Sequence, residues 1–177
     1  LTPRQLLELA YRRGVRVLTI DDATTMESVR ANVIKVAEGL GQRSRGDALV
    51  VSMDERLDEA RPAAGQTRSM ALYLTPGGFT AGKGTLVDAI LTAAGFSNLA
   101  TSPGYAPVSV ERVALSPPKR FILGFFDLVR SDWRGPGRHP VVRGAAKGRV
   151  ATRLPASTLT CPAWFAADAA VMASEGR

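Results

Sequence analysis

The chain has few of the residues that build reactive centres. Its 177 residues include one cysteine, Cys161, and one histidine, His139. A single cysteine excludes an internal disulfide framework, and one histidine with one distant cysteine gives no metal site that spacing could assemble. We interpret Cys161 as a small, partly buried apolar residue and His139 as the start of a helix. Nothing marks a reactive serine or cysteine, so we predict a non-enzyme with no cofactor and no protein-only metal site.

Long apolar runs and aromatic residues are also scarce. No run of 18 apolar residues exists, which excludes a membrane-spanning helix, and aromatic residues make up only 6% of the chain. The absence of a recognised nucleic-acid motif argues against a nucleic-acid partner. The 45% apolar content is enough for the core of one ordinary domain. Because the chain opens Leu1-Thr-Pro-Arg without a signal peptide, we expect a processed or truncated product.

Acidic residues are scarce in the second part of the chain. Residues 1–66 carry ten basic and ten acidic residues, whereas residues 67–177 carry thirteen against six and so supply the whole net charge of +7. The basic residues concentrate between residues 130 and 153, where Asp132 is the only acid: Arg130, Arg134, Arg138, Arg143, Lys147, Arg149 and Arg153. This charge favours an anionic partner such as a chelate or a membrane-side surface, and it also fits a solvated basic face.

Glycine is abundant in one informative segment, residues 70–95. An apolar run from Met70 to Leu74 is stopped by Pro76, and Thr85 is placed to cap a helix that Gly95 ends. The segment predicts a buried strand, a glycine-rich loop and a helix. Such a loop at the carboxyl end of a strand is where α/β proteins commonly hold ligands.

A phosphate-binding loop is one interpretation of this segment. Gly77, Gly82 and Lys83 fit the first part of the G-x-x-x-x-G-K-[ST] pattern. The next position should carry a hydroxyl for magnesium, but it is Gly84, and Thr85 comes one residue late. A nucleotide-binding α/β domain using Gly77–Lys83 therefore stays an alternative, as do a turn without a ligand and a basic interaction module.

Helical and strand patterns alternate along the chain. We expect helices at 3–13, 25–40, 44–61, 85–94, 109–115, 139–146 and 163–174, and strands at 15–20, 69–74, 120–126 and 148–153. Thr2 is the expected cap of the first helix, and Ser44 with Asp47 forms a predicted capping box. This alternation predicts the α/β class, with a mostly parallel sheet flanked by helices.

Three blocks resemble one family of proteins. They are Tyr-Leu-Thr-Pro-Gly-Gly-Phe-Thr-Ala-Gly-Lys-Gly-Thr at 73–85, the segment 107–123 with Val-Ser-Val-Glu, and Leu-Thr-Cys-Pro-Ala-Trp-Phe within 159–170. Together they are similar to the C-terminal lobe of the periplasmic substrate-binding proteins that serve ABC importers of iron-siderophores, heme and vitamin B12. The resemblance implies a periplasmic protein that captures a metal chelate and delivers it to an ABC permease.

The resemblance also implies an organisation. Residues 1–43 would be a remnant of the N-terminal lobe, residues 44–66 a lobe-spanning helix and turn, and residues 67–177 the C-terminal α/β lobe. The family's ligand lies between the lobes, so this chain would carry half a site. We expect membrane contact only through the permease or a lipid anchor. We also expect an uncovered apolar face on residues 1–43 that leads to self-association.

The resemblance assigns roles to five residues. Glu111 matches the carboxylate that docks on arginines of the permease, a task suited to a bidentate acceptor. Phe79, Tyr105, Trp164 and Phe165 match aromatic positions that line the cleft and suit large rigid ligands.

The last loop departs from the cobalamin-binding members of that family. Ala163 and Ala167 stand where those members have charged residues. With the basic segment 130–153, this favours an anionic iron chelate or heme over cobalamin.

Overall fold

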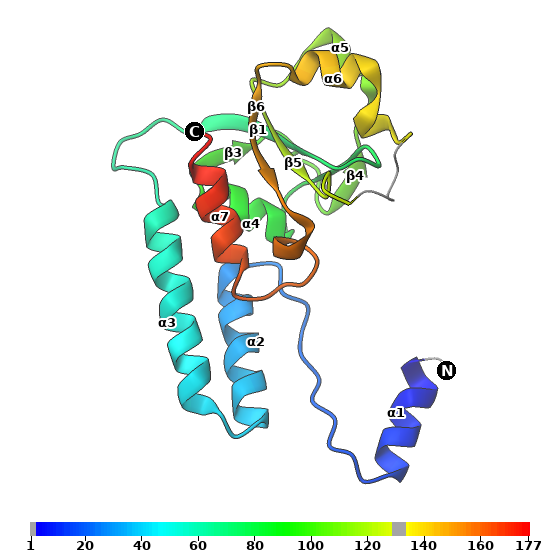
Figure 1. Cartoon of the computed structure of the whole chain (residues 1–177), viewed down its shortest axis with the longest axis vertical. Coiled ribbons are helices and arrows are strands. Elements are labelled where there is room, and N and C mark those ends of the chain that lie inside the picture. Colours follow the sequence, from blue (N-terminus) through cyan, green and yellow to red (C-terminus); the bar gives the residue numbers. More distant parts are fainter. Residues whose placement is uncertain (1–2, 129–133) are drawn as a thin grey trace.

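The computed structural model describes residues 3–128 and 134–177 and shows an α/β protein (Figure 1). Its centre is a four-stranded sheet in the order β3-β1-β5-β6. The strands are β1 Ser69–Leu74, β3 Phe96–Asn98, β5 Arg120–Gly124 and β6 Val150–Leu154. All three pairings in this sheet are parallel, which confirms the predicted fold class.

Helices cover both faces of this sheet. They are α4 Leu86–Ala93 and α7 Ala166–Ser174 on one face, and α5 Val110–Leu115 and α6 Pro140–Ala146 on the other. Tyr73 and Ile122 pack in the cluster with α4 and α7, whereas their neighbours Leu72 and Phe121 pack in the cluster with α5 and α6. Successive strand residues face opposite sides. The two central strands are therefore buried on both faces, which explains their continuous apolar runs.

Helices α2 Met26–Gly39 and α3 Arg43–Ala60 form a hairpin that projects from the sheet (Figure 1). Helix α3 is unbroken, as predicted, and runs against α7, where Arg56 Nε lies 2.9 Å from Asp168 Oδ1. The predicted capping box at Ser44 is wrong. The helix begins at Arg43, and the Asp47 carboxylate accepts a hydrogen bond from Arg43 Nε at 3.0 Å. No helix in the described part of the chain is both long and apolar enough to cross a membrane.

The predicted strand at 15–20 is also wrong. Helix α1 Pro3–Arg12 stands apart from the sheet (Figure 1), and the chain between it and α2 is extended without a strand partner in the described residues. Its β-branched sequence favours a strand, but a strand forms only where a neighbour accepts its backbone hydrogen bonds. Every strand of the described sheet comes from 69–154.

The remaining differences are short elements. Strand β3 of the central sheet was not expected, nor was a two-stranded antiparallel ribbon, β2 Phe79–Ala81 with β4 Tyr105–Pro107. The 3₁₀ turns η1 Pro136–Arg138 and η2 Ala156–Thr158 were not expected either. Helix α7 begins at residue 166 rather than 163, which leaves Cys161 exposed in a loop instead of partly buried. The expected cap Thr2 lies outside the described residues.

Large apolar side chains are exposed around α1 and the segment after it. The clearest are Leu6, Tyr11, Val15, Leu18, Ile20 and Leu40. Exposed apolar patches of this kind usually meet a partner. We therefore predict that the 177-residue chain self-associates, as sedimentation velocity at rising concentration would show. Leu18→Asp with Ile20→Asp should weaken the association, while Leu115→Asp, at an exposed site on α5, should not. A strictly monomeric chain at high concentration would contradict the prediction.

Candidate ligand-binding site

The ribbon of β2 and β4 lies just after the carboxyl end of β1 and carries two of the predicted ligand residues. Phe79 pairs with Pro107, and Ala81 pairs with Tyr105. Because directly opposed residues share a face of a ribbon, Phe79 and Tyr105 are diagonal neighbours on one face. Their side chains are 49% and 66% exposed. The fold thus brings together two aromatic side chains that are 26 residues apart and leaves both open to solvent.

A tight turn places Phe79 at this position. The Thr75 amide donates to the Phe79 carbonyl at 2.9 Å, and the Phe79 amide donates to Thr75 Oγ1 at 3.1 Å. Gly78 has a φ of 78°, and a Cβ there would lie 2.6 Å from Pro136. The turn therefore needs glycine at residue 78 both for its backbone conformation and for close contact with the loop before α6.

The hydrogen bonds of the next residues, Gly82 to Thr85, argue against a phosphate-binding loop. The Gly82 amide donates to the Gly104 carbonyl at 2.8 Å, and the Lys83 amide donates to the Ser102 carbonyl at 3.2 Å. Thr85 Oγ1 is buried, donates to the Gly82 carbonyl at 2.8 Å and accepts from the Asp88 amide as the cap of α4. A phosphate cradle needs free backbone amides and a hydroxyl for magnesium. Here the amides of Gly82 and Lys83 and the hydroxyl of Thr85 are already used to hold the loop itself.

Trp164 and Phe165 form a second aromatic pair, in the loop before α7. Their ring centroids lie 5.4 Å apart in an edge-to-face arrangement, the only ring–ring contact in the described parts of the chain. Trp164 is 44% exposed and lines an apolar hollow of about 320 Å³ with Ile20, Val36 and Leu40. The fold therefore gives two separate aromatic pairs rather than one cluster of four.

Tyr105 has a charged neighbour that the sequence did not reveal. Partial burial and, to a smaller extent, the negative charge of Asp22 raise the pKa of the Tyr105 phenol. The hydroxyl, like that of any tyrosine at neutral pH, is protonated and can donate a hydrogen bond to a ligand. Asp22 lies in the segment before α2, so only the fold, and no local motif, reveals this neighbour.

The Tyr73 side chain lies in the core cluster that α4 and α7 cover, and it is 1% exposed. Its hydroxyl has no hydrogen-bond partner among the described residues. Burial, and then the nearby Tyr105, raise the pKa of this phenol. A folded-state pKa above the unfolded value of about 10 means that its contribution to stability is full below pH 10 and is lost as the pH rises further.

We predict that Tyr73→Phe leaves the chain equally stable at neutral pH or stabilises it by about 1 kcal/mol, because an unsatisfied buried hydroxyl is removed. The loss of stability above pH 10 should become shallower. Urea unfolding at several pH values measures both effects, with Tyr11→Phe, at an exposed site on α1, as the control. A clear loss of stability at neutral pH would show that the hydroxyl has a partner.

Glu111 is exposed in the first turn of α5. Ser109 Oγ caps this helix and donates to Glu111 Oε2 at 2.7 Å. This bond, a backbone hydrogen bond and the nearby His139 hold the pKa of the Glu111 carboxyl below its usual value. The carboxylate makes no ion pair within the described residues. The Val108 amide bonds to the Gly78 carbonyl at 2.7 Å, which ties the start of α5 to the aromatic ribbon.

His139 begins α6, as its position before Pro140 predicts. Its Nδ1 accepts a hydrogen bond from the Val141 amide at 3.3 Å. The described residues hold no group of three histidine, cysteine or acidic side chains that could bind a metal ion.

Comparisons with known proteins agree on one fold. Residues 3–123 match the family model described as periplasmic binding protein. The heme-binding protein BhuT, solved with two hemes, is 25% identical with a TM-score of 0.72, over 98% of this chain and 70% of that one. A periplasmic heme-binding protein from Pseudomonas aeruginosa is 28% identical with a TM-score of 0.59, over 84% and 53% of the two chains.

A third solved structure differs in its stated ligand. A chain described as the ABC-type Fe³⁺-hydroxamate transport system from Saccharomonospora viridis is 20% identical with a TM-score of 0.70, over 96% of this chain and 64% of that one. None of the curated proteins matches the chain.

Proposed function

Because this chain belongs to the periplasmic binding protein family, we propose that it captures a metal chelate for an ABC importer and delivers it to the permease. Members of this family are transport components and not enzymes, and the family supports a periplasmic location. In this proposal residues 67–177 are the C-terminal lobe, residues 44–66 the lobe-spanning helix and turn, and residues 1–43 the remnant of the N-terminal lobe.

The observation that supports chelate capture most is the exposed pair Phe79 and Tyr105. Both side chains lie on a short ribbon at the carboxyl end of the parallel sheet. Aromatic rings give a flat ligand a large contact area at low cost in side-chain entropy. The protonated Tyr105 hydroxyl adds one hydrogen-bond donor. Trp164 and Phe165 would contact the ligand from the last loop, as a second and separate surface.

Heme or an anionic iron-siderophore is the ligand that we favour. Both are large and rigid, and their negative charge suits a chain with a net charge of +7, which attracts anions at long range. The two solved relatives with the higher identity are described as heme-binding proteins. Cobalamin is less well matched, since Ala163 and Ala167 carry no charge.

Titration of the chain with hemin, followed by Soret absorbance, tests this proposal. Phe79→Ala and Tyr105→Ala should each weaken binding about three- to tenfold, the effect of removing one aromatic contact. Tyr11→Ala, at an exposed tyrosine on α1, should change nothing. A ferric siderophore and cobalamin, titrated in parallel by fluorescence quenching, would rank the ligands. Equal affinities of all variants for every chelate would contradict the proposed site.

A further inference from the structure

A second hollow, of about 550 Å³, lies between α6 and the sheet. Leu74 and Leu123 line it from β1 and β5, Val142 lines it from α6, and Phe126 lines it from the loop after β5. None of the four predicted chelate-binding side chains contributes to it. It is therefore separate from the aromatic ribbon and from the apolar hollow beside Trp164.

All charged side chains that line this hollow are cationic. They are Arg138, Arg143, Lys147 and Arg153, and no described carboxylate lines it. Within residues 3–128 and 134–177, none of the four takes part in an ion pair. Arg130 and Asp132 of the basic segment lie outside the described residues. Unpaired like charges around a concave, partly apolar surface raise the local concentration of anions.

Arg138 is held in place by Phe126. Its guanidinium carbon lies 4.9 Å from the centroid of the Phe126 ring, and its Nη2 donates to the Phe126 carbonyl at 3.3 Å. A guanidinium that is fixed in this way binds an oxyanion with little loss of side-chain entropy.

We propose that this hollow binds a small amphipathic organic anion. A phosphate or carboxylate group would be held by Arg138 and the neighbouring cations, and an aromatic or short aliphatic body would lie against Leu123, Phe126 and Val142. Known small-molecule sites span roughly 300–1,000 Å³, and this hollow falls in that range. This site is additional to the chelate site, so either proposal can be wrong while the other is correct.

Phenyl phosphate is the probe, titrated by calorimetry and mapped by amide chemical shifts. Binding should shift the amides of Val142 and Gly148. Arg138→Met should weaken it at least about tenfold, because a charge-assisted hydrogen bond is lost. Lys147→Gln should weaken it less and reduce its dependence on salt.

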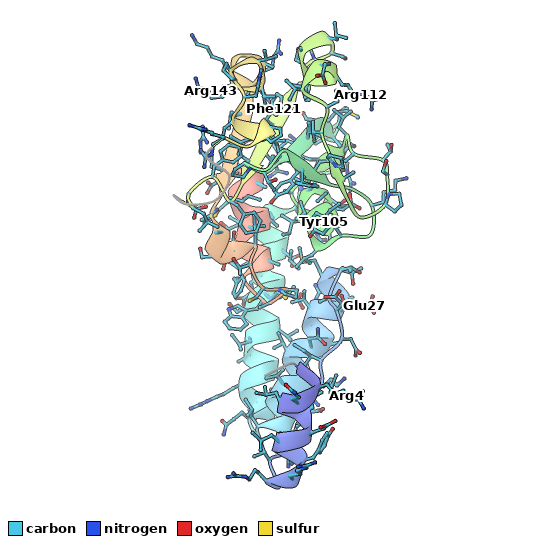
Figure 2. The ribbon with its side chains drawn as sticks, turned by 90° about the vertical axis from the view of Figure 1, so that its right-hand side faces the viewer. Arg4, Glu27, Tyr105, Arg112, Phe121 and Arg143 are labelled. Atoms are coloured by element: carbon cyan, nitrogen blue, oxygen red, sulfur yellow. The ribbon has the colours of Figure 1, made fainter. Side chains whose placement is uncertain are left out.

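The matched control is Arg112→Gln. Figure 2 shows Arg112 on α5 and Arg143 on α6, two separate helices, and Arg112 does not line the hollow. This variant should bind phenyl phosphate like the parent chain. If Arg138→Met does not fold, Arg143→Gln with Lys147→Gln carries the test, because both side chains are exposed.

Three further probes separate the possible sources of binding. Benzyl alcohol has the ring without the charge, and inorganic phosphate has the charge without the ring, so both should bind more weakly than phenyl phosphate. The proposal would be overturned if phenyl phosphate did not bind at millimolar concentration. It would also be overturned if binding were unchanged in Arg138→Met and in Arg143→Gln with Lys147→Gln. Binding only to vesicles that contain phosphatidylglycerol would also overturn it, because the cations would then serve a membrane surface.

Discussion

Replacing Gly82 by alanine is expected to destabilise the chain by about 3 kcal/mol or more. A Cβ at residue 82 would lie 1.8 Å from the Ser102 carbonyl oxygen, and that atom belongs to the backbone and cannot rotate away. Relief of this clash requires separation of the two loops. That movement breaks the bonds from the Gly82 and Lys83 amides to the Gly104 and Ser102 carbonyls. Urea unfolding of parent and variant measures the loss.

Gly144→Ala is the control for this experiment. Residue 144 lies inside α6, and a Cβ there would meet nothing within 4 Å. Alanine in a helix interior is better than glycine by about 0.5–1 kcal/mol, so this variant should be neutral or more stable. Gly82→Ala with the stability of the parent would contradict the close approach of residue 82 to the Ser102 carbonyl.

Glu111→Lys is expected to reduce delivery to the permease at least about thirtyfold, provided that Glu111 docks on cationic residues of the permease. The carboxylate is exposed and ionised at neutral pH, and the hydrogen bond from Ser109 lowers its pKa further. Lysine would set like charges against each other, whereas Glu111→Ala would remove only the attraction and should have a smaller effect. Uptake and permease binding, assayed with the intact protein and its importer, measure both.

Ligand affinity should not change in either Glu111 variant, because no residue of the aromatic ribbon contacts this carboxylate by a hydrogen bond or ion pair among the described residues. Glu175→Lys, at an exposed position after α7, is the control for the added charge. Full uptake by Glu111→Lys at limiting protein concentration would exclude the docking role.

Much of the fold could be predicted from local sequence because its main elements are long and regular. The apolar runs of β1 and β5 and the cap at Thr85 are local signals, and they gave β1, β5 and α4 correctly. The strand predicted at 15–20 is wrong because strand propensity does not say whether a partner strand is present. Strand β3 and the ribbon were missed because each of these strands has only three residues, too few to show alternation.

The site could be predicted only in part for a related reason. Phe79 and Tyr105 stand out as aromatic residues in loops rich in glycine and proline. Their place on one face depends on the pairing of β2 with β4, and the nearness of Asp22 to Tyr105 depends on the path of the chain before α2. The cationic hollow under α6 likewise combines residues from a turn, a helix and a strand, which charge counting along the sequence does not relate.

The two-stranded ribbon also offers a route to altered specificity. It is not hydrogen-bonded into the four-stranded sheet, and its exposed side chains contribute to none of the buried core clusters. Exchange of Phe79 and Tyr105 for other residues should therefore leave folding intact, as long as Ala81 and Gly82 are kept beneath them. The ribbon is therefore a suitable place for libraries of substitutions, which could be screened for new ligands while the rest of the fold stays unchanged.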